Sequence, residues 1–435
     1  MKKLLTLLLL VCLNSLFSQT KAEFATSDID NFWIAFDKIT TTTDTLQQYH
    51  YLNTFFIAKG SPGLKALMEA RNYTPQEYLS VIRNYPLYWK SIRSNTLKAK
   101  ELAGKIEKGI ARLKKIYPEL KPAPVYFTIG AMRTGGTVLN GMVLIGSEIA
   151  LTDKNTFTSE FPESARQERR TYFDSNPIDD VVLLNVHEYV HTQQKPMVQN
   201  LLSQTLYEGV AEFVSVTAMG VPSAAPAIAY GEKNEARVKK KFEQEVFNFR
   251  AQDKWLWSDR ENEFGVRDLG YYIGYAICKK YYDNAKDKKQ AIKKMIELDY
   301  SNETEIEEFI NSTNYFSGTV TQMYDNFEKS RPAVVSIRNI ENGSQAVTPG
   351  TISVTLVFSE MMDTRFTNFD YGPDGEETLL RIKKVIGFSA DGKSMTFEVA
   401  PDPDKKYQLL IGNGFRDTDG NPLKPYLIEF RTTSK

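Results

Sequence analysis

The sequence predicts an α+β protein in which a mostly helical region with a small β-sheet is followed by a β-sandwich. Apolar residues recur with helical spacing over residues 22–120 and again over residues 176–289. Two short β-type runs, residues 125–129 and 142–145, separate these helical stretches. From residue 334 onward, short strand-like runs alternate with turn signals such as Asn342-Gly343, which is typical of a small sandwich.

The chain of 435 residues is long enough for at least two domains, each with its own core. Pro122-Ala123-Pro124 breaks the first helical pattern, and the pattern changes again near Ser330-Arg331-Pro332. We therefore predict four segments, which are a signal peptide (1–18), an N-terminal helical region (19–121), a core that holds the candidate site (122–330) and a β-sandwich domain (331–435).

The N-terminus is typical of an export signal. Lys2 and Lys3 precede an apolar run over residues 4–13, and small Ser18 marks the expected cut. The run is too short for a permanent transmembrane anchor, and Cys12 lacks the small preceding residue of a lipoprotein signal. We expect an exported protein, periplasmic or secreted to the cell surface, without a transmembrane anchor or a lipid anchor.

The charge balance excludes a strongly basic protein. Lys and Arg together number 54, as do Asp and Glu, and this balance gives no indication of a nucleic-acid partner. Cys278 is the one cysteine after the signal, and its apolar surroundings indicate a core residue.

The residues with the clearest chemistry are His187, Glu188 and His191, which form an H-E-x-x-H pattern in a predicted helix. Two histidines one helical turn apart share a face and can bind one Zn²⁺ ion. Glu188 is placed to take a proton from a zinc-bound water. His50, the third histidine, lies far from the pattern in sequence and is not expected to be a ligand.

A second predicted helix, residues 198–219, carries two carboxylates four residues apart. Burying Glu208 and Glu212 in this apolar helix is costly unless a metal or a partner compensates them. A hairpin of the two helices would bring Glu208 to the zinc as third ligand. Glu212, one turn on, would orient a ligand histidine through its other ring nitrogen. Gly209 lets the second helix approach closely.

The combination of H-E-x-x-H with Glu208-Gly209-Val210-Ala211-Glu212-Phe213 resembles the gluzincin metallopeptidases. This resemblance implies His187, His191 and Glu208 as ligands of one zinc ion and Glu188 as the general base. It also implies a zincin-like metallopeptidase fold for residues 122–330.

Further site residues are expected, Tyr271 on the same resemblance and the others from the sequence itself. Several gluzincins stabilise the oxyanion with the tyrosine of a Tyr-x-x-Gly helix, a spacing that Tyr271 and Gly274 match, although a core role for this tyrosine is equally open. Gly135 and Gly136 mark a turn or a place where a substrate approaches the backbone. Arg267 is placed either to bind a substrate carboxylate or to pair with Asp268.

The C-terminal region resembles bacterial immunoglobulin-like modules of exported proteins, through residues 354–363 and 417–432. Such a module is expected to contact a surface or a polymer.

Together these features predict an exported zinc peptidase that acts on a peptide or protein. An endopeptidase is preferred over an aminopeptidase because Gly130-Ala131-Met132-Arg133-Thr134 lacks the acid that would hold a free amine. The alternative is a non-catalytic exported zinc protein that binds a surface or polymer. The open fourth zinc position and Glu188 favour the enzyme.

Overall fold

The computed structural model describes residues 23–257 and 262–434. The chain forms two compact units. Of the described residues, the first unit contains 23–199, 203–235 and 262–315, and the second contains 200–202, 236–257 and 316–434. The α+β class is confirmed, since about half of the chain is helical and the C-terminal part holds separate β-sheets. The predicted signal peptide (1–18) and Cys12 lie outside the described residues.

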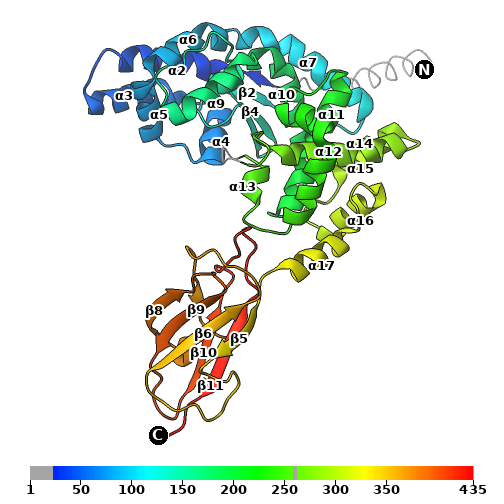
Figure 1. The fold of residues 1–435 in the computed structure, drawn as a ribbon. Helices are drawn as coiled ribbons and strands as arrows, with labels where there is room; N and C mark the ends of the chain where they lie inside the picture. The colour runs from blue at the N-terminus through cyan, green and yellow to red at the C-terminus, as the bar shows by residue number, and fades with distance from the viewer. Residues whose placement is uncertain (1–22, 258–261, 435) are drawn as a thin grey trace, which may run out of the picture. The chain divides into compact units, whose positions relative to one another are not determined.

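The first unit combines helices with one small sheet (Figure 1). Its strands are β1 (Phe24–Ala25), β2 (Val125–Thr128), β3 (Gly136–Leu139) and β4 (Met142–Gly146). The helices between β1 and β2 are α2 (Ser27–Ile39), α3 (Thr45–Phe55), η2 (Ile57–Lys59), α4 (Pro62–Arg71), α5 (Pro75–Asn84), α6 (Pro86–Leu97) and α7 (Ala99–Ile116). The later ones are α8 (Ser147–Ala150), α9 (Glu163–Asp174), α10 (Pro177–His191), α11 (Leu201–Met219), α12 (Pro226–Glu245), α14 (Leu269–Asn284), α15 (Lys288–Glu297) and α16 (Glu303–Thr313). Residues 201–202 of α11 and 236–245 of α12 belong to the second unit.

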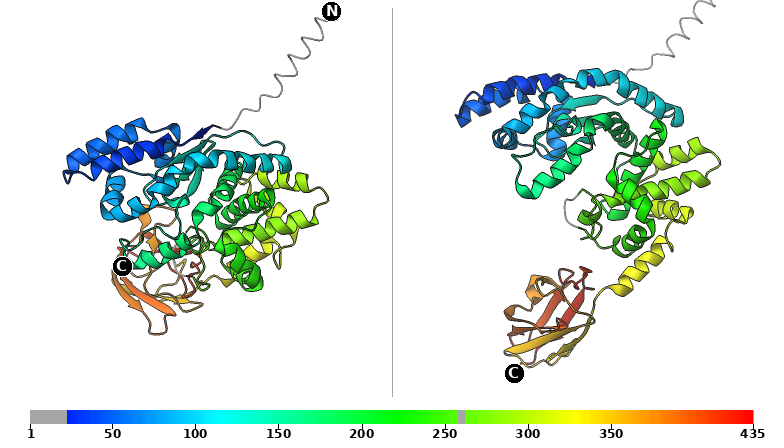
Figure 2. Two further views of the ribbon diagram at one scale, coloured as in Figure 1. Left: turned by 90° about the horizontal axis from the view of Figure 1, so that it is seen from above. Right: turned by 45° about the horizontal axis from the view of Figure 1, so that its top comes forward.

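The N-terminal helices enclose an aromatic core. The ring of Phe32 on α2 lies within 5.4 Å, centroid to centroid, of Trp33, Phe56 and Trp89. Helices α4, α5 and α6 each begin with a proline, which suits the first helical position because its missing N–H needs no partner there. Figures 1 and 2 show these blue to cyan helices beside the small sheet.

The sheet has the order β1-β2-β4-β3. Strands β1, β2 and β4 run parallel, whereas β3 pairs with β4 in antiparallel fashion and forms the edge. All four residues of β2 are buried, as expected for a strand covered on both faces. Helices α4 and α10 both pack against this sheet.

The second half of helix α10 is fully enclosed. Every residue from Asn185 to His191 is buried. Helix α7 packs along it at Gly109, where an added Cβ would lie 2.9 Å from the Val186 side chain. Pro177 begins the helix with Asp179 and Asp180 in its first turn, where carboxylates favour the positive end of the helix dipole.

The second unit contains two β-sheets that share one hydrophobic core. Their strand orders are β5-β6-β9-β8 and β11-β10-β7. Alternate residues of β6, such as Leu356, and of β9, such as Phe397, meet Leu409 and Ile428 of the other sheet in this core. The elements are α13 (Gln252–Trp255), α17 (Val320–Ser330), β5 (Val334–Arg338), β6 (Ile352–Phe358), β7 (Phe369–Asp370), η3 (Glu376–Thr378), β8 (Ile382–Phe388), β9 (Ser394–Val399), β10 (Lys406–Ile411) and β11 (Tyr426–Arg431).

Two strands of this region had no clear sequence signal. Strand β7 has only two residues, and β8 is an edge strand whose middle is exposed and whose register shifts twice against β9. An exposed edge strand lacks the apolar alternation by which strands are recognised.

None of the helices in the described residues combines the length and apolar character needed to cross a membrane.

Candidate metal centre

His187 and His191 occupy successive turns at the end of α10 and point toward each other. Their Nε2 atoms lie 3.1 Å apart. Both side chains are buried, each residue being 8% exposed. The i, i+4 spacing of a helix brings the two rings together directly.

Glu208 on α11 completes the group. Its Oε2 lies 3.2 Å from His191 Nε2 and 3.5 Å from His187 Nε2. The potential ligand atoms of the three residues lie within 4.8 Å of one another, and within the described part of the chain this is the one such cluster of three or more metal-ligating side chains. One carboxylate and two imidazoles are a donor set that suits Zn²⁺.

The other nitrogen of each ring already has a partner. His187 Nδ1 lies 3.0 Å from Glu212 Oε2, and His191 Nδ1 lies 2.6 Å from the amide oxygen of Gln194. Because both oxygens are acceptors, we assign the ring proton to Nδ1 in each neutral histidine. Two Nε2 lone pairs and a carboxylate oxygen then face one another, and only a cation or an extra proton can satisfy them.

The shifted pKa values of these residues also favour a positive charge between them. Burial lowers the pKa of His187, but its contacts with Glu208 and Glu212 outweigh burial and raise the pKa to about 10. Burial raises the pKa of Glu208, while the facing histidines bring it well below its usual range. The pKa of Glu212 is lowered in the same way by His187. These residues fit a bound divalent cation.

The partners of the two histidines are themselves anchored. Gln194 donates through Nε2 to the backbone oxygen of Tyr207 and to the hydroxyl of Tyr300, both at 3.0 Å. The ring of Tyr207 stacks on His191 with centroids 4.6 Å apart. Gln194, Tyr207 and Tyr300 were not among the residues predicted for the site. The one available signal was the position of Gln194, three residues after His191.

Glu188 is buried next to the histidines and faces the edge strand. A Cβ added to Gly136 would lie 2.5 Å from Glu188 Oε1, so a larger residue here would displace this carboxylate. Burial raises the pKa of Glu188, and the positive fields of His191, His187 and Arg71 oppose that rise. Arg71 was not predicted to belong to the site. It lies at the end of α4, more than 110 residues away in sequence.

Tyr271 lies beside the histidines. Its ring stacks on His187 with centroids 6.2 Å apart. It reaches this place because α14 and α11 cross in backbone contact, where an added Cβ at Gly209 would lie 2.1 Å from the carbonyl carbon of Gly274. Its predicted role at an oxyanion stays a prediction.

Arg267 and Gly135, two of the three residues predicted to bind substrate, lie against residues outside the metal cluster. Arg267 pairs with Glu168 and with Asp268, at 2.8 Å each. Gly135 lies near Ile149 and Tyr172, at the turn that leads into β3. Of the predicted substrate-binding residues, Gly136 is the one that contacts the cluster, through Glu188.

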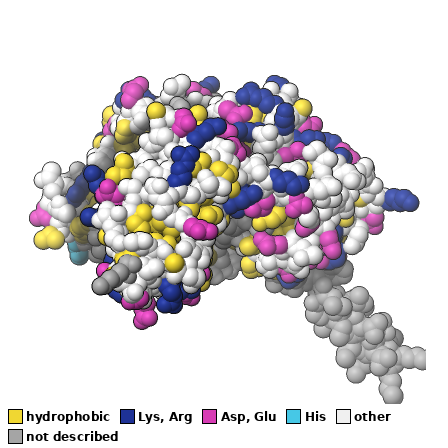
Figure 3. Space-filling view, turned by 60° about the horizontal axis from the view of Figure 1, so that its bottom comes forward, with side chains coloured by type: hydrophobic (Ala, Val, Ile, Leu, Met, Phe, Trp, Pro, Cys, Tyr) yellow, Lys and Arg dark blue, Asp and Glu magenta, His cyan; other side chains and the backbone are white. Residues whose placement is uncertain are grey.

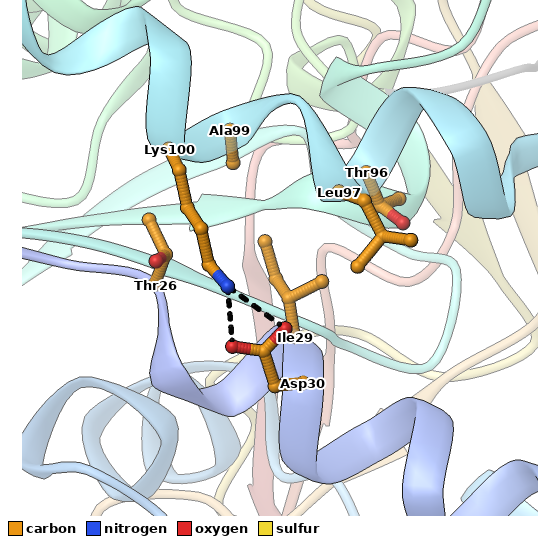
Figure 4. Close-up of a pocket in the computed structure, with 7 residues that line it drawn as sticks. All are labelled: Thr26, Ile29, Asp30, Thr96, Leu97, Ala99 and Lys100. Carbon is orange, nitrogen blue, oxygen red and sulfur yellow. Dashed lines mark hydrogen bonds and ion pairs between the residues drawn. The ribbon is translucent and has the colours of Figure 1, made fainter.

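A small surface hollow lies apart from the metal cluster. A small hollow between α2 and the α6–α7 junction is lined by Thr26, Ile29, Asp30, Thr96, Leu97, Ala99 and Lys100 (Figure 4). The hollow is crossed by a 2.8 Å ion pair of Lys100 and Asp30 and contains no residue of the cluster. Figure 3 shows acidic and basic side chains interspersed on the visible face.

Comparison with known families corrects the functional assignment. Residues 16–264, more than half of the chain, match the family of the gliding motility protein GldB, a lipoprotein family. No curated protein matches the chain. The match covers the cluster but not Tyr271.

The resemblance to gluzincins is therefore wrong as an assignment of family, and so are the zincin fold, the zinc-peptidase function and the protease class drawn from it. The physical reason is that the spacing of two histidines and a glutamate specifies how a metal can be held. It does not specify which bond, if any, is broken. The expectation of export agrees with the lipoprotein family, and the chain is an exported protein associated with the cell envelope. The expectation that it lacks a lipid anchor does not agree with that family.

Proposed function

Because the chain belongs to the family of the gliding motility protein GldB, we propose that it serves gliding motility as a cell-envelope protein with one buried Zn²⁺ ion. The ion would be held by His187, His191 and Glu208. The observation that carries this proposal is the convergence of two Nε2 atoms and a carboxylate oxygen whose neighbouring ring nitrogens are already engaged.

The electrostatics support a divalent ion rather than a proton. Glu188, Glu208 and Glu212 are all at most 8% exposed and lie around the same two imidazoles. Buried carboxylates are strongly unfavourable without compensating charge, and Zn²⁺ supplies two positive charges at one point.

The test is the metal content of the purified full-length chain. We expect about one zinc per chain in the wild type and in His50→Ala, since His50 is exposed and lies outside the cluster. His187→Ala and His191→Ala should each lose the ion, because two protein ligands hold zinc poorly. Equal zinc in all four proteins would contradict the assigned ligands.

The role in gliding is tested in cells. Replacing the chromosomal copy with the His187→Ala variant should impair gliding while the exported protein remains in the envelope fraction. Normal gliding with a zinc-free variant would separate the metal from the motility function.

That the metal centre catalyses a reaction stays a prediction. Peptide hydrolysis is no longer part of that prediction. If bound, Zn²⁺ would supply Lewis acidity to a water molecule. Glu188 would be the residue that holds a proton beside the ion. The immunoglobulin-like character of the β-sheet region and its contact with a surface or polymer also stay predictions, as does the choice between periplasm and cell surface.

A further inference from the structure

The loop of residues 129–135, which leads into edge strand β3, connects the metal centre to the N-terminal helices. On its buried side the loop is held by Glu148. The Glu148 carboxylate accepts hydrogen bonds from the backbone N–H groups of Gly130 and Met132 at 2.8 and 3.1 Å. Thr134 donates from its hydroxyl to the backbone oxygen of Gly136 at 2.6 Å. The loop therefore holds a fixed position beside Glu188.

Arg71 reaches this loop from the end of α4. Its Nη2 donates to Thr134 Oγ1 at 3.2 Å. Thr134 in turn contacts Gly136, which lies directly against the Glu188 carboxylate. The positive charge of Arg71 also acts on Glu188, which agrees with this proximity.

The guanidinium of Arg71 has a hydrogen-bond donor without a partner in the described protein. Its Nε is buried and has no hydrogen-bond partner. Among the residues that the structure describes, no carboxylate lies within ion-pair distance of Arg71. Buried donors without a partner are rare because each costs about 1–3 kcal/mol, so such a group calls for an explanation.

Two other arginines differ in this respect. Arg133, on the same loop, pairs with Glu77 at 2.9 Å and lies over the ring of Tyr73. Arg93 on α6 forms a 2.6 Å ion pair with Asp37. These two have carboxylate partners, whereas Arg71 has none among the described residues.

We propose that Arg71 binds an oxyanion, either a carboxylate or a phosphate group, of the molecule that occupies the metal centre. The fork of a guanidinium matches the oxygens of both groups, and its Nε is one of the donors that such a fork uses. This inference rests on the proposed metal centre and adds the class of ligand that the centre accepts.

The experiment is a calorimetric titration of inorganic phosphate and, separately, of acetate into the full-length chain, with zinc measured on the same samples. The variants are Arg71→Gln, Arg71→Lys and the control Arg93→Gln, which removes the same charge from a paired arginine. We expect Arg71→Gln to weaken binding of the preferred anion at least about tenfold. Arg71→Lys should recover only part of this loss because lysine lacks the fork, and Arg93→Gln should bind like the wild type.

The outcomes separate the two proposals. Zinc in every variant with equal anion binding in wild type and Arg71→Gln would overturn the role of Arg71 and leave the metal centre standing. Lack of zinc in the wild type would instead remove the metal centre, and the same titration on the metal-free proteins would then decide the role of Arg71 by the same tenfold criterion. Tighter binding of phosphate than of acetate would assign a phosphate-bearing ligand, and the reverse order a carboxylate.

Discussion

The Nε2 atoms of His187 and His191 lie 3.1 Å apart, and the opposite nitrogen of each ring contacts an acceptor from outside the H-E-x-x-H pattern. Glu212 fixes one ring and Gln194 fixes the other. Both rings are therefore oriented before any ion binds, which lowers the entropic cost of binding.

The first prediction concerns Gln194. Gln194→Ala removes the acceptor at His191 Nδ1, so this ring should lose its preferred tautomer and orientation. We expect zinc affinity to fall about 10- to 100-fold. The measurement is a competition titration with a chromophoric chelator. Gln193→Ala is the matched control, since Gln193 contacts Lys121 and Thr192 rather than a histidine, and an equal loss in both variants would contradict the prediction.

The second prediction separates Glu188 from the ligands. Glu188→Gln keeps the size of the side chain, and the carboxylate is not among the three converging donors. Zinc content should stay at the wild-type level in Glu188→Gln and should fall in Glu208→Gln, because an amide is a much poorer ligand than a carboxylate. Loss of zinc from Glu188→Gln would make this residue a ligand as well.

The third prediction concerns the crossing of α11 and α14. An added Cβ at Gly209 would lie 2.1 Å from Gly274 C, and one at Gly274 would lie 2.0 Å from the Thr205 carbonyl oxygen. Because backbone cannot move aside cheaply, Gly209→Ala should lower the free energy of unfolding by about 3 kcal/mol or more. Gly104→Ala on α7 is the control, since no atom lies within 4 Å of its added Cβ, and it should gain up to about 1 kcal/mol. Urea unfolding of the three proteins tests this, and a neutral Gly209→Ala would argue against the tight crossing.

The fourth prediction is a pH dependence that arises from Glu148. Burial raises the pKa of Glu148 from 4.5 to about 7, although backbone hydrogen bonds from Gly130 and Met132 oppose the rise. The folded state thus binds this proton more tightly than the unfolded state. The stability that Glu148 contributes is full below about pH 4.5 and is lost as the pH rises toward 7, at up to about 1.4 kcal/mol per pH unit.

The measurement for Glu148 is urea unfolding between pH 5 and pH 8. In Glu148→Gln the decrease in stability with rising pH should be smaller than in the wild type, by about 3 kcal/mol at most over the full range. Glu101→Gln, which removes an exposed carboxylate on α7, should leave the wild-type slope unchanged. Identical slopes in wild type and Glu148→Gln would contradict the prediction.

The parts of the site that follow from local spacing could be predicted from the sequence. His187 with His191, and Glu208 with Glu212, lie one helical turn apart, so the sequence alone places each pair on one face. Arg71 and Tyr300 could not be predicted, because packing brings them to the site from helices far away in the chain. The fold class followed from periodicity, whereas β8 was missed because its exposed residues do not alternate. The reaction class was wrong because ligand spacing carries no information on substrate.

The crossing at Gly209 and Gly274 also bears on where the chain can be divided. The family match ends at residue 264, yet α14, which begins at Leu269, buries Tyr272, Ile273, Ile277 and Cys278 in the same unit. A chain cut after residue 264 would expose the backbone of α11 at Gly209 and the apolar surface that α14 covers, so it should aggregate rather than fold. The end of the family match is thus not the end of the folded unit. Shortened forms of the protein should retain at least the whole of α14.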